Sequence, residues 1–167
     1  MFVRPATFAD AAGLARVHVA AWRSAYVGVM PDAYLAELDE ARFERGWVRA
    51  LEEAVSTVLV GAVDDAVQGF ATFGAARDEG PAASRQLYAF NLHPIAFGSG
   101  LAVALHQEVI AALRDAGHES AYLWVAELNP RARRFYEREG WEPDGASHME
   151  EFGGAPLTET RYIRGIS

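Results

Sequence analysis

The sequence predicts one α/β (α+β) domain over residues 1–167, in which a mixed β-sheet of about seven strands is flanked by about four helices. Its length suits one domain, and 51% hydrophobic with 23% charged residues is typical of soluble globular proteins. The first third has the periodicity of helices, whereas short β-branched runs alternate with helical stretches later. Between residues 86 and 125, a strand, a glycine-rich turn, a helix and a second strand follow one another, an order typical of parallel strand pairing.

The first third of the chain predicts one strand and three helical stretches. Thr7 and Asp10 are spaced as a capping pair at the start of the first helix, and Pro31 suits the first turn of the second. Phe43, Trp47 and Leu51 recur at every fourth position, which indicates a third amphipathic helix. The predicted segments are a strand over 1–4 and helices over 8–26, 31–38 and 43–51.

The middle of the chain changes to strand patterns. Two β-branched runs flank the acidic turn Asp64-Asp65 and predict a β-hairpin. Pro94 ends a third run, and the composition of the preceding stretch is that of a loop. The predicted segments are strands over 55–63, 67–73 and 86–92, with a loop over 77–83.

The last third predicts two helices and three strands. Leu101, Leu105, Val109 and Leu113 form one apolar stripe, which indicates a helix packed on a sheet. Asn129 and Pro130 suit the N-cap and first position of another helix. The predicted segments are helices over 101–113 and 130–139 and strands over 121–125, from 141 onward and over 157–163, the last two joined through Gly153-Gly154.

Composition excludes several kinds of chemistry. The chain has no cysteine, which removes disulfides, thiolate catalysis and cysteine-based metal centres, and we predict no other metal site. All 15 basic residues are arginine, so lysine nucleophiles and a P-loop lysine are excluded. A net charge of -8 argues against nucleic-acid binding. With no signal-peptide pattern and no apolar run long enough to span a bilayer, we expect a cytoplasmic protein without membrane partners.

Gly98 and Gly100 lie where a strand leads into a helix. Backbone N–H groups at a helix N-terminus have no intrahelical acceptor, so this turn could bind phosphate or pyrophosphate. The glycines could equally serve only to make a tight turn, because the sequence has neither G-x-G-x-x-G nor G-K-[ST].

A second motif follows the next predicted strand. Asn129, Ala132 and Tyr136 share one helical face within LWVAELNPRARRFYEREGW. This segment, together with the glycine turn in residues 92–113, resembles the GCN5-related N-acetyltransferase (GNAT) family. HVAAWRSAYVGVMPDAYL near the start and GGAPLTETRYIRGI near the end also resemble bacterial members, so the resemblance covers almost the whole chain.

The resemblance implies a strongly twisted sheet that splays open near its middle and binds acetyl-CoA there. The splay would lie between the strand ending at Leu92 and the strand ending near Val125, and a bulge at Leu92 would expose backbone groups to the pantetheine. Tyr136 would be the general acid that protonates the departing thiolate, since a phenol near the sulfur can donate a proton. The resemblance implies that the cofactor-binding residues are Leu92, Phe97, Gly98, Ser99, Gly100, Leu101, Asn129 and Ala132.

The sequence departs from the family pattern in its loop and in its general base. Ile95 stands where the family carries Arg or Gln, and the loop over 94–100 is two residues shorter than usual, which puts cofactor affinity in doubt. Gln86 and Trp124 stand at the two positions where relatives carry a glutamate. Glu127 is then the best carboxylate for a general base, although it could be an ordinary loop charge. The other acceptors of a proton would be His18 and His93.

These features predict an acetyl-CoA-dependent N-acetyltransferase in which a primary amine of a small molecule or peptide attacks the thioester directly. Trp22, Tyr26 and Tyr88 are the candidate substrate-binding residues, although the same side chains could belong to the core. The alternatives are a catalytically silent acyl-CoA-binding or sensing domain of the same fold, and an assembly module with a vestigial cleft. Aromatic residues in the first helices and last hairpin further predict a homodimer.

Overall fold

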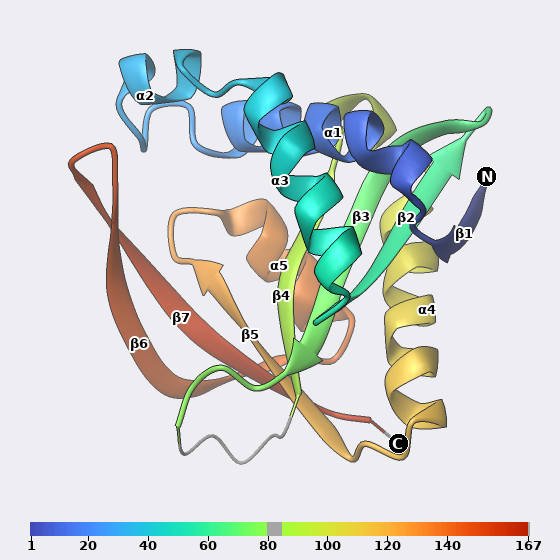
Figure 1. Cartoon of the computed structure of the whole chain (residues 1–167). Coiled ribbons are helices and arrows are strands. Elements are labelled where there is room, and N and C mark those ends of the chain that lie inside the picture. Colours follow the sequence, from blue (N-terminus) through green and yellow to red (C-terminus); the bar gives the residue numbers. More distant parts are fainter. Residues whose placement is uncertain (80–84, 167) are drawn as a thin grey trace.

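A computed structural model describes residues 1–79 and 85–166. Within them, seven strands form one mixed sheet in the order β1-β2-β3-β4-β5-β7-β6 (Figure 1). β4 and β5 are parallel, whereas the other neighbouring strands are antiparallel, so the parallel pair predicted from the sequence is confirmed. The strands are β1 (Phe2–Pro5), β2 (Thr57–Val63), β3 (Ala66–Ala75), β4 (Arg85–Leu92), β5 (Ser120–Ala126), β6 (Glu142–Phe152) and β7 (Ala155–Gly165).

Five α-helices and two 3-10 helices accompany the sheet in the described residues, against the four or so helices expected. α2 is only five residues long and lies within the helical stretch predicted over 31–38, and α3 contains the stretch predicted over 43–51. The helices are η1 (Phe8–Asp10), α1 (Ala11–Ala25), α2 (Asp32–Ala36), α3 (Glu40–Glu53), η2 (Pro94–Ala96), α4 (Leu101–Asp115) and α5 (Pro130–Arg138).

The helix predicted over residues 8–26 is therefore a 3-10 turn followed by α1. Its capping pair is confirmed, because the Thr7 backbone N–H donates to Asp10 Oδ2 at 2.7 Å. The same carboxylate accepts two guanidinium bonds from Arg4 at 2.7 and 2.8 Å, and these bonds, with those from Thr7, lower the pKa of Asp10 to about 2. Hydrogen bonds and charge thus hold η1 to β1.

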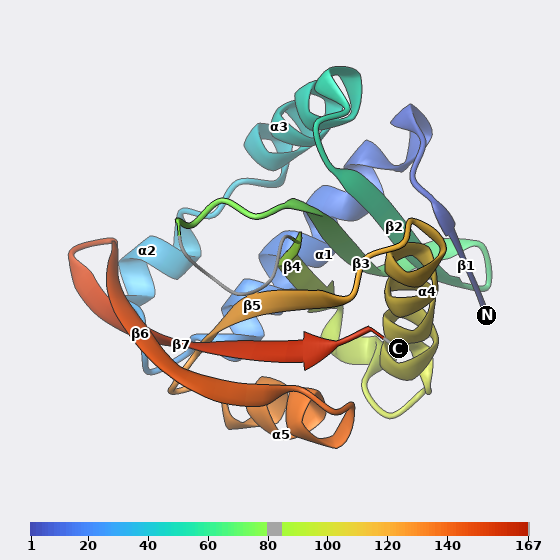
Figure 2. The same ribbon diagram turned by 90° about the horizontal axis from the view of Figure 1, so that it is seen from below.

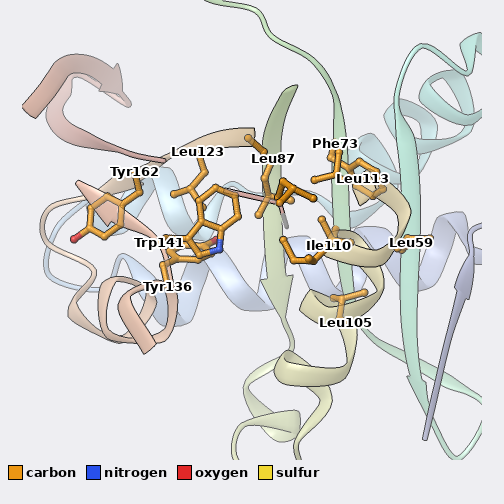
Figure 3. Packing of buried hydrophobic residues seen from close by; sticks show 14 of the residues in the cluster. Leu59, Phe73, Leu87, Leu105, Ile110, Leu113, Leu123, Tyr136, Trp141 and Tyr162 are labelled. Atoms are coloured by element: carbon orange, nitrogen blue, oxygen red, sulfur yellow. The ribbon is translucent and has the colours of Figure 1, made fainter. Parts of the chain in front are cut away.

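Helices cover both faces of the sheet (Figure 2). α1 and α3 pack on one face, where Leu14 and Trp47 contact Val60 and Phe70. α4 and α5 pack on the other, where Leu105 and Tyr136 share a cluster with Leu123 and Trp141 (Figure 3). Consecutive residues of β2, such as Leu59 and Val60, enter opposite clusters, as the two-residue period of a strand requires.

The C-terminal strands follow the prediction closely. Gly153 and Gly154 form the turn between β6 and β7 with φ of 57° and 81°, which confirms the predicted hairpin. The penultimate strand begins at Glu142 rather than at Trp141, whose ring is buried in the core at 1% exposure. Of the loop predicted over 77–83, residues 80–83 lie outside the described residues.

The aromatic residues on which the expected homodimer rested are mostly packed inside the protomer. Trp22, Tyr26, Tyr34 and Phe152 pack against a buried cluster that contains Met30 and Leu157. The homodimer stays a prediction, and these rings do not form the exposed patch that suggested it. No helix in residues 1–79 and 85–166 is long and apolar enough to cross a bilayer.

Candidate functional site

The cleft is a hollow of about 910 Å³ beside the parallel strand pair. Its walls come from the end of β4, the turn before α4, the first turn of α4, the length of α5 and the C-terminal half of α1. In Figure 1, β5 and α5 lie beside β4 below α1, which is the region these walls enclose. Of the residues predicted to bind a cofactor, Leu92, Phe97, Gly98, Gly100, Asn129 and Ala132 line this cleft.

The cleft exists because β4 and β5 stop pairing. In the described residues, their parallel ladder pairs Gln86 with Tyr122 and Leu87 with Leu123, and the strands separate beyond it. The His93 N–H donates to the Gln68 carbonyl at 2.8 Å. Because hydrogen-bonded and non-hydrogen-bonded pairs alternate along an antiparallel ladder, the backbone N–H and C=O of Leu92 then point away from β3 into the gap. The predicted splay is confirmed.

The bulge expected at Leu92 lies elsewhere. Leu92 pairs regularly with Gly69, and the irregularity occurs at Tyr88, which stands unpaired between Ala89 and Leu87. Leu92 exposes its backbone through the separation of β4 from β5, so no local bulge is needed there. The prediction of a bulge at Leu92 is therefore wrong, although its backbone is accessible as expected.

The glycine turn provides free backbone donors at one end of the cleft. Gly98 and Gly100 have φ of 77° and 88°, a region open to glycine but strained for other residues. The amides of Phe97, Ser99 and Leu101 already donate within the turn, the last to the Ser99 hydroxyl at 3.2 Å. Within residues 97–103, all of which the structure describes, the amides without a protein acceptor are those of Gly98, Gly100, Ala102 and Val103, and all four residues line the cleft. Ser99 and Leu101 do not line it.

Arginines on α5 give the wall of the cleft positive charge. Arg131, Arg134 and Arg138 lie at helical spacing along the wall. The Arg131 guanidinium also stacks over the Phe97 ring at 4.1 Å, which ties α5 to the glycine turn. Ile95, where the resemblance called for Arg or Gln, is 75% exposed and supplies no charge. The sequence analysis did not predict a role for these three arginines. Their i, i+3, i+7 spacing places them on one face of the helix and could have indicated it.

Tyr136 lies in the wall of the cleft and is 7% exposed. Its ring packs against Phe90 and Trp141, with centroids 6.3 and 6.1 Å away. Burial, with a smaller effect of Tyr26, raises the pKa of Tyr136 well above its ordinary value. The phenol therefore carries its proton at neutral pH, as a proton donor must, and it is a weaker acid than an exposed tyrosine.

Asn129 and Glu127 have different roles from one another. The Asn129 side-chain oxygen accepts from the Ala132 N–H at 3.1 Å and so caps α5, which positions Tyr136. Glu127 is exposed, accepts the Thr160 hydroxyl at 3.1 Å, and does not line the cleft. The geometry therefore does not place Glu127 where a base for the cleft would stand.

The two candidate histidines make contacts within the fold and do not line the cleft. His18 lies among the rings of Trp22, Phe43, Trp47 and Phe70, and burial lowers its pKa to about 4. The His93 side chain accepts the Ile95 N–H at 3.3 Å and caps η2.

The three predicted substrate residues separate into two places. Trp22 and Tyr26 pack together on α1, with ring centroids 5.3 Å apart, and Trp22 contacts Phe152 of the last hairpin. Tyr88 lies outside the cleft, because its hydroxyl donates to the Ala75 carbonyl and its ring lies under the Arg77 guanidinium at 3.6 Å. Trp22 and Tyr26 thus face the sheet surface between α1 and the β6–β7 hairpin.

A polar cluster on that surface was not predicted. His148 Nε2 lies 3.2 Å from Glu159 Oε1 and 3.7 Å from Glu150 Oε1. The side chains come from opposite strands, so no local sequence pattern brings them together. The register of β6 on β7, which places His148 opposite Glu159, does.

The comparisons with known proteins agree on one family. The family model described as "Acetyltransferase (GNAT) family" matches residues 18–141. The uncharacterized N-acetyltransferase YuaI of Bacillus subtilis (strain 168) is 35% identical over 130 residues, which are 77% of this chain and 73% of that protein.

Solved structures agree on the fold. PaiA N-acetyltransferase of Thermoplasma acidophilum, solved with coenzyme A, is 17% identical with a TM-score of 0.71, covering 98% of this chain and 97% of its own. The yncA protein of Salmonella typhimurium, solved with its cofactor acetyl-CoA, is 20% identical with a TM-score of 0.72, covering 100% and 94%.

Proposed function

The chain belongs to the GNAT family of acetyltransferases, and we propose that it transfers the acetyl group of acetyl-CoA to a primary amine. The observation that carries the proposal is the cleft itself, where separated strands, free turn amides and a buried phenol meet. The two related structures with bound coenzyme A or acetyl-CoA support the choice of acyl donor. The continuous seven-stranded sheet supports residues 1–167 as a single acetyltransferase domain.

The residues present fit acetyl-CoA. Free amides at a helix N-terminus bind anions, so Gly98, Gly100, Ala102 and Val103 would hold the pyrophosphate. The arginines of α5 would add positive charge near the phosphates. The backbone of Leu92, which faces the gap, would pair with the amides of the pantetheine arm. When bound, acetyl-CoA supplies an acyl group activated as a thioester.

The protein's own groups would then stabilise charge and supply a proton. A backbone N–H facing the gap at the end of β4 would donate to the oxyanion that forms as the amine attacks, an interaction worth roughly 3–4 kcal/mol per donor. The Tyr136 hydroxyl would protonate the leaving thiolate, a contribution of roughly 10²–10⁴-fold. The cleft is lined on this side by Phe90 and Tyr136, which would limit the access of water to the thioester.

Amine-dependent release of free thiol from acetyl-CoA tests the proposal. We expect at least one amine in a panel of aryl and alkyl amines, amino acids and peptides to release thiol in step with amide formation detected by mass. No amide from any member at millimolar acetyl-CoA would contradict it.

A silent acyl-CoA-binding domain is the second candidate. Ile95 in the loop and the non-ionisable Gln86 and Trp124 favour it, since each departs from the expected pattern. Such a domain would be stabilised by acetyl-CoA without any release of thiol by amines, whereas the enzyme would show both.

A further inference from the structure

His106 is a buried polar residue that the proposed function does not use. It lies on α4 beside the apolar residues Leu105, Val109 and Ile110, and it is only 1% exposed. A buried polar group lowers stability unless it is hydrogen-bonded, and an apolar side chain would fill the same space without that requirement. The hydrogen-bond partners of the ring therefore indicate what the histidine contributes here.

Both ring nitrogens of His106 have polar neighbours, which determine where its proton lies. The Trp141 indole N–H donates to Nε2 at 2.9 Å, and Nη1 of Arg164 lies 3.3 Å from the same nitrogen. Indole and guanidinium groups can only donate, so Nε2 carries no proton and the N–H of the ring is on Nδ1, which lies 3.5 Å from Glu139 Oε2. Burial, with a smaller effect of Arg164, lowers the pKa of His106 to about 4, so the neutral ring is the form present at pH 7.

Trp141 connects His106 with Tyr136. Its indole is bound to α4 through His106, and its backbone N–H donates to the Tyr136 carbonyl at 2.9 Å. The rings of Trp141 and Tyr136 also lie beside each other in the core, with centroids 6.1 Å apart (Figure 3). A displacement of Trp141 would therefore move the last turn of α5, to which Tyr136 belongs.

A second contact joins His106 to α5 through Phe135. The two rings meet edge to face, with centroids 5.8 Å apart and 87° between their planes. Phe135 also stacks on Phe90 of β4 at 5.5 Å, and both of these side chains line the cleft. The ring of His106 thus touches two residues, Phe135 and Trp141, that each pack against Tyr136.

His106 also lies close to the end of α4 that faces the cleft. It follows Ala102 and Val103, whose free amides would hold the pyrophosphate, by one helical turn. Tyr136 lies in another wall of the same cleft. The hydrogen bond between His106 and Trp141 therefore links the helix that would bind the donor to the helix that carries the proposed general acid.

We propose that His106 is a positioning residue, which holds α4 and α5 together through its hydrogen bond with Trp141 and so keeps the Tyr136 hydroxyl where the thioester sulfur would lie. This inference rests on the proposed function, because it assigns Tyr136 the role of general acid. His106 does not line the cleft, so it acts through Trp141 and takes no proton in the reaction. An apolar side chain at this position would fill the space but would not orient the indole.

Three substitutions of His106 separate the hydrogen bond from the packing. The amide of His106→Gln reaches about as far from the backbone as Nε2 and can accept from Trp141, whereas that of His106→Asn reaches only as far as Nδ1. His106→Leu fills the space without an acceptor. We expect kcat to stay within about twofold in His106→Gln and to fall about tenfold in the other two, because a small displacement of a catalytic group is enough for such a loss.

The dissociation constant of acetyl-CoA should change little in all three variants, because the glycine turn is left intact. Steady-state kinetics with an amine that is acetylated, together with titration of acetyl-CoA, measure both quantities. A full rate in His106→Leu, or equal losses in the glutamine and leucine variants, would contradict the proposal. His106→Gln keeps the acceptor, so it also serves if leucine prevents folding.

Val60→Ala is the matched control for a general loss of stability. Val60 is fully buried, but it packs on the opposite face of the sheet with Leu14 and Phe70. Its truncation therefore leaves a cavity away from α4 and α5. At a temperature at which circular dichroism shows every variant folded, we expect Val60→Ala to keep its turnover. Equal losses of kcat in Val60→Ala and His106→Leu would assign the effect to stability and refute the positioning role.

A double-mutant cycle tests whether His106 acts through the Tyr136 hydroxyl. In Tyr136→Phe that hydroxyl is absent, so a further His106→Leu change should lower kcat by less than about twofold, against about tenfold when the hydroxyl is present. Tenfold losses in both backgrounds would show that His106 acts on some other step and would overturn the proposal.

Hydrogen exchange gives a measurement that does not depend on turnover. Peptides covering 130–141 should exchange faster in His106→Leu than in His106→Gln, while the β2–β3 hairpin over 57–75 exchanges equally in both. Equal exchange over 130–141, in a protein that does form an amide, would overturn this inference alone. Faster exchange there, in a protein that acetylates no amine, would contradict the proposed function and the catalytic part of the inference, and would leave only the contact between α4 and α5 standing.

Discussion

Tyr136 combines burial with a position in the wall of the cleft. Tyr136→Phe keeps the ring and its contacts with Phe90 and Trp141 but removes the proton donor. We expect kcat to fall by about 10²-fold with little change in the dissociation constant of acetyl-CoA. Single-turnover rates, which separate chemistry from product release, check this expectation. Weaker acetyl-CoA binding with an unchanged rate would instead mean that the hydroxyl only orients the donor.

Gly98 and Gly117 are a matched pair of positions for testing the turn before α4. Both have φ of 77°, and a Cβ at either would meet nothing within 4 Å. Valine at either position should therefore cost similar stability through backbone strain, on the order of 1–3 kcal/mol. Only Gly98→Val should weaken acetyl-CoA binding, by about tenfold, which is 1.4 kcal/mol. Titration calorimetry checks this, and equal affinity in the two variants would remove the turn from the cofactor site.

Which residues could be predicted from sequence depended on how local their neighbours are. Asn129 and Tyr136 lie in one short motif whose helical spacing determines their arrangement, and the residues of the glycine turn are neighbours in the sequence. Glu159 meets His148 only through the register of the β6–β7 hairpin, which shifts between Pro143 and Ser147. No spacing within the sequence specifies that shift. The prediction of Tyr88 as a substrate residue failed to anticipate the bulge that turns its hydroxyl toward Ala75.

Asn129 caps α5, the helix that carries Tyr136 in the wall of the cleft. Because Asn129 accepts from the Ala132 N–H, Asn129→Ala should destabilise the protein by about 1 kcal/mol and lower turnover through displacement of Tyr136. Asn129→Ser can still cap the helix, so it should restore most of both properties. Denaturant unfolding and steady-state kinetics on the two variants check this. If serine restores stability but not turnover, the amide group of Asn129 itself contacts the donor.

The helices and strands were largely predictable from the sequence, whereas the points at which neighbouring strands stop pairing were not. Periodicity, caps and turn glycines predicted the β2–β3 and β6–β7 hairpins and the long helices. The point at which β4 and β5 separate, after Leu87 and Leu123, follows from twist and from the helices packed on the two faces. Such features depend on the assembled sheet, and the splay was therefore expected from family resemblance alone.

Stability of the whole molecule should depend on pH through its buried histidines. Burial lowers the pKa of His18 and of His106 to about 4, below the value of about 6.5 in an unfolded chain. Between these two pKa values the unfolded state binds more protons than the folded state. The free energy of unfolding therefore has its full value above pH 6.5 and falls toward pH 4.

Replacing one of these histidines should flatten that dependence. His18 Nδ1 is buried without a hydrogen-bond partner in the described residues, so leucine can take its place among the aromatic rings. Between pH 7.5 and pH 5, the free energy of unfolding of the unmodified protein should fall by about 2 kcal/mol more than that of His18→Leu. Urea unfolding at the two pH values measures this difference. Parallel changes in the two proteins would show that His18 is not the group responsible.

Hydrogen exchange with and without acetyl-CoA tests most directly that the gap between β4 and β5 is the donor site. At millimolar acetyl-CoA we predict slower exchange in peptides covering 90–103 and 128–138, with no change in the β2–β3 hairpin over 57–75. Unchanged exchange in both segments, or protection confined to another face, would contradict the account.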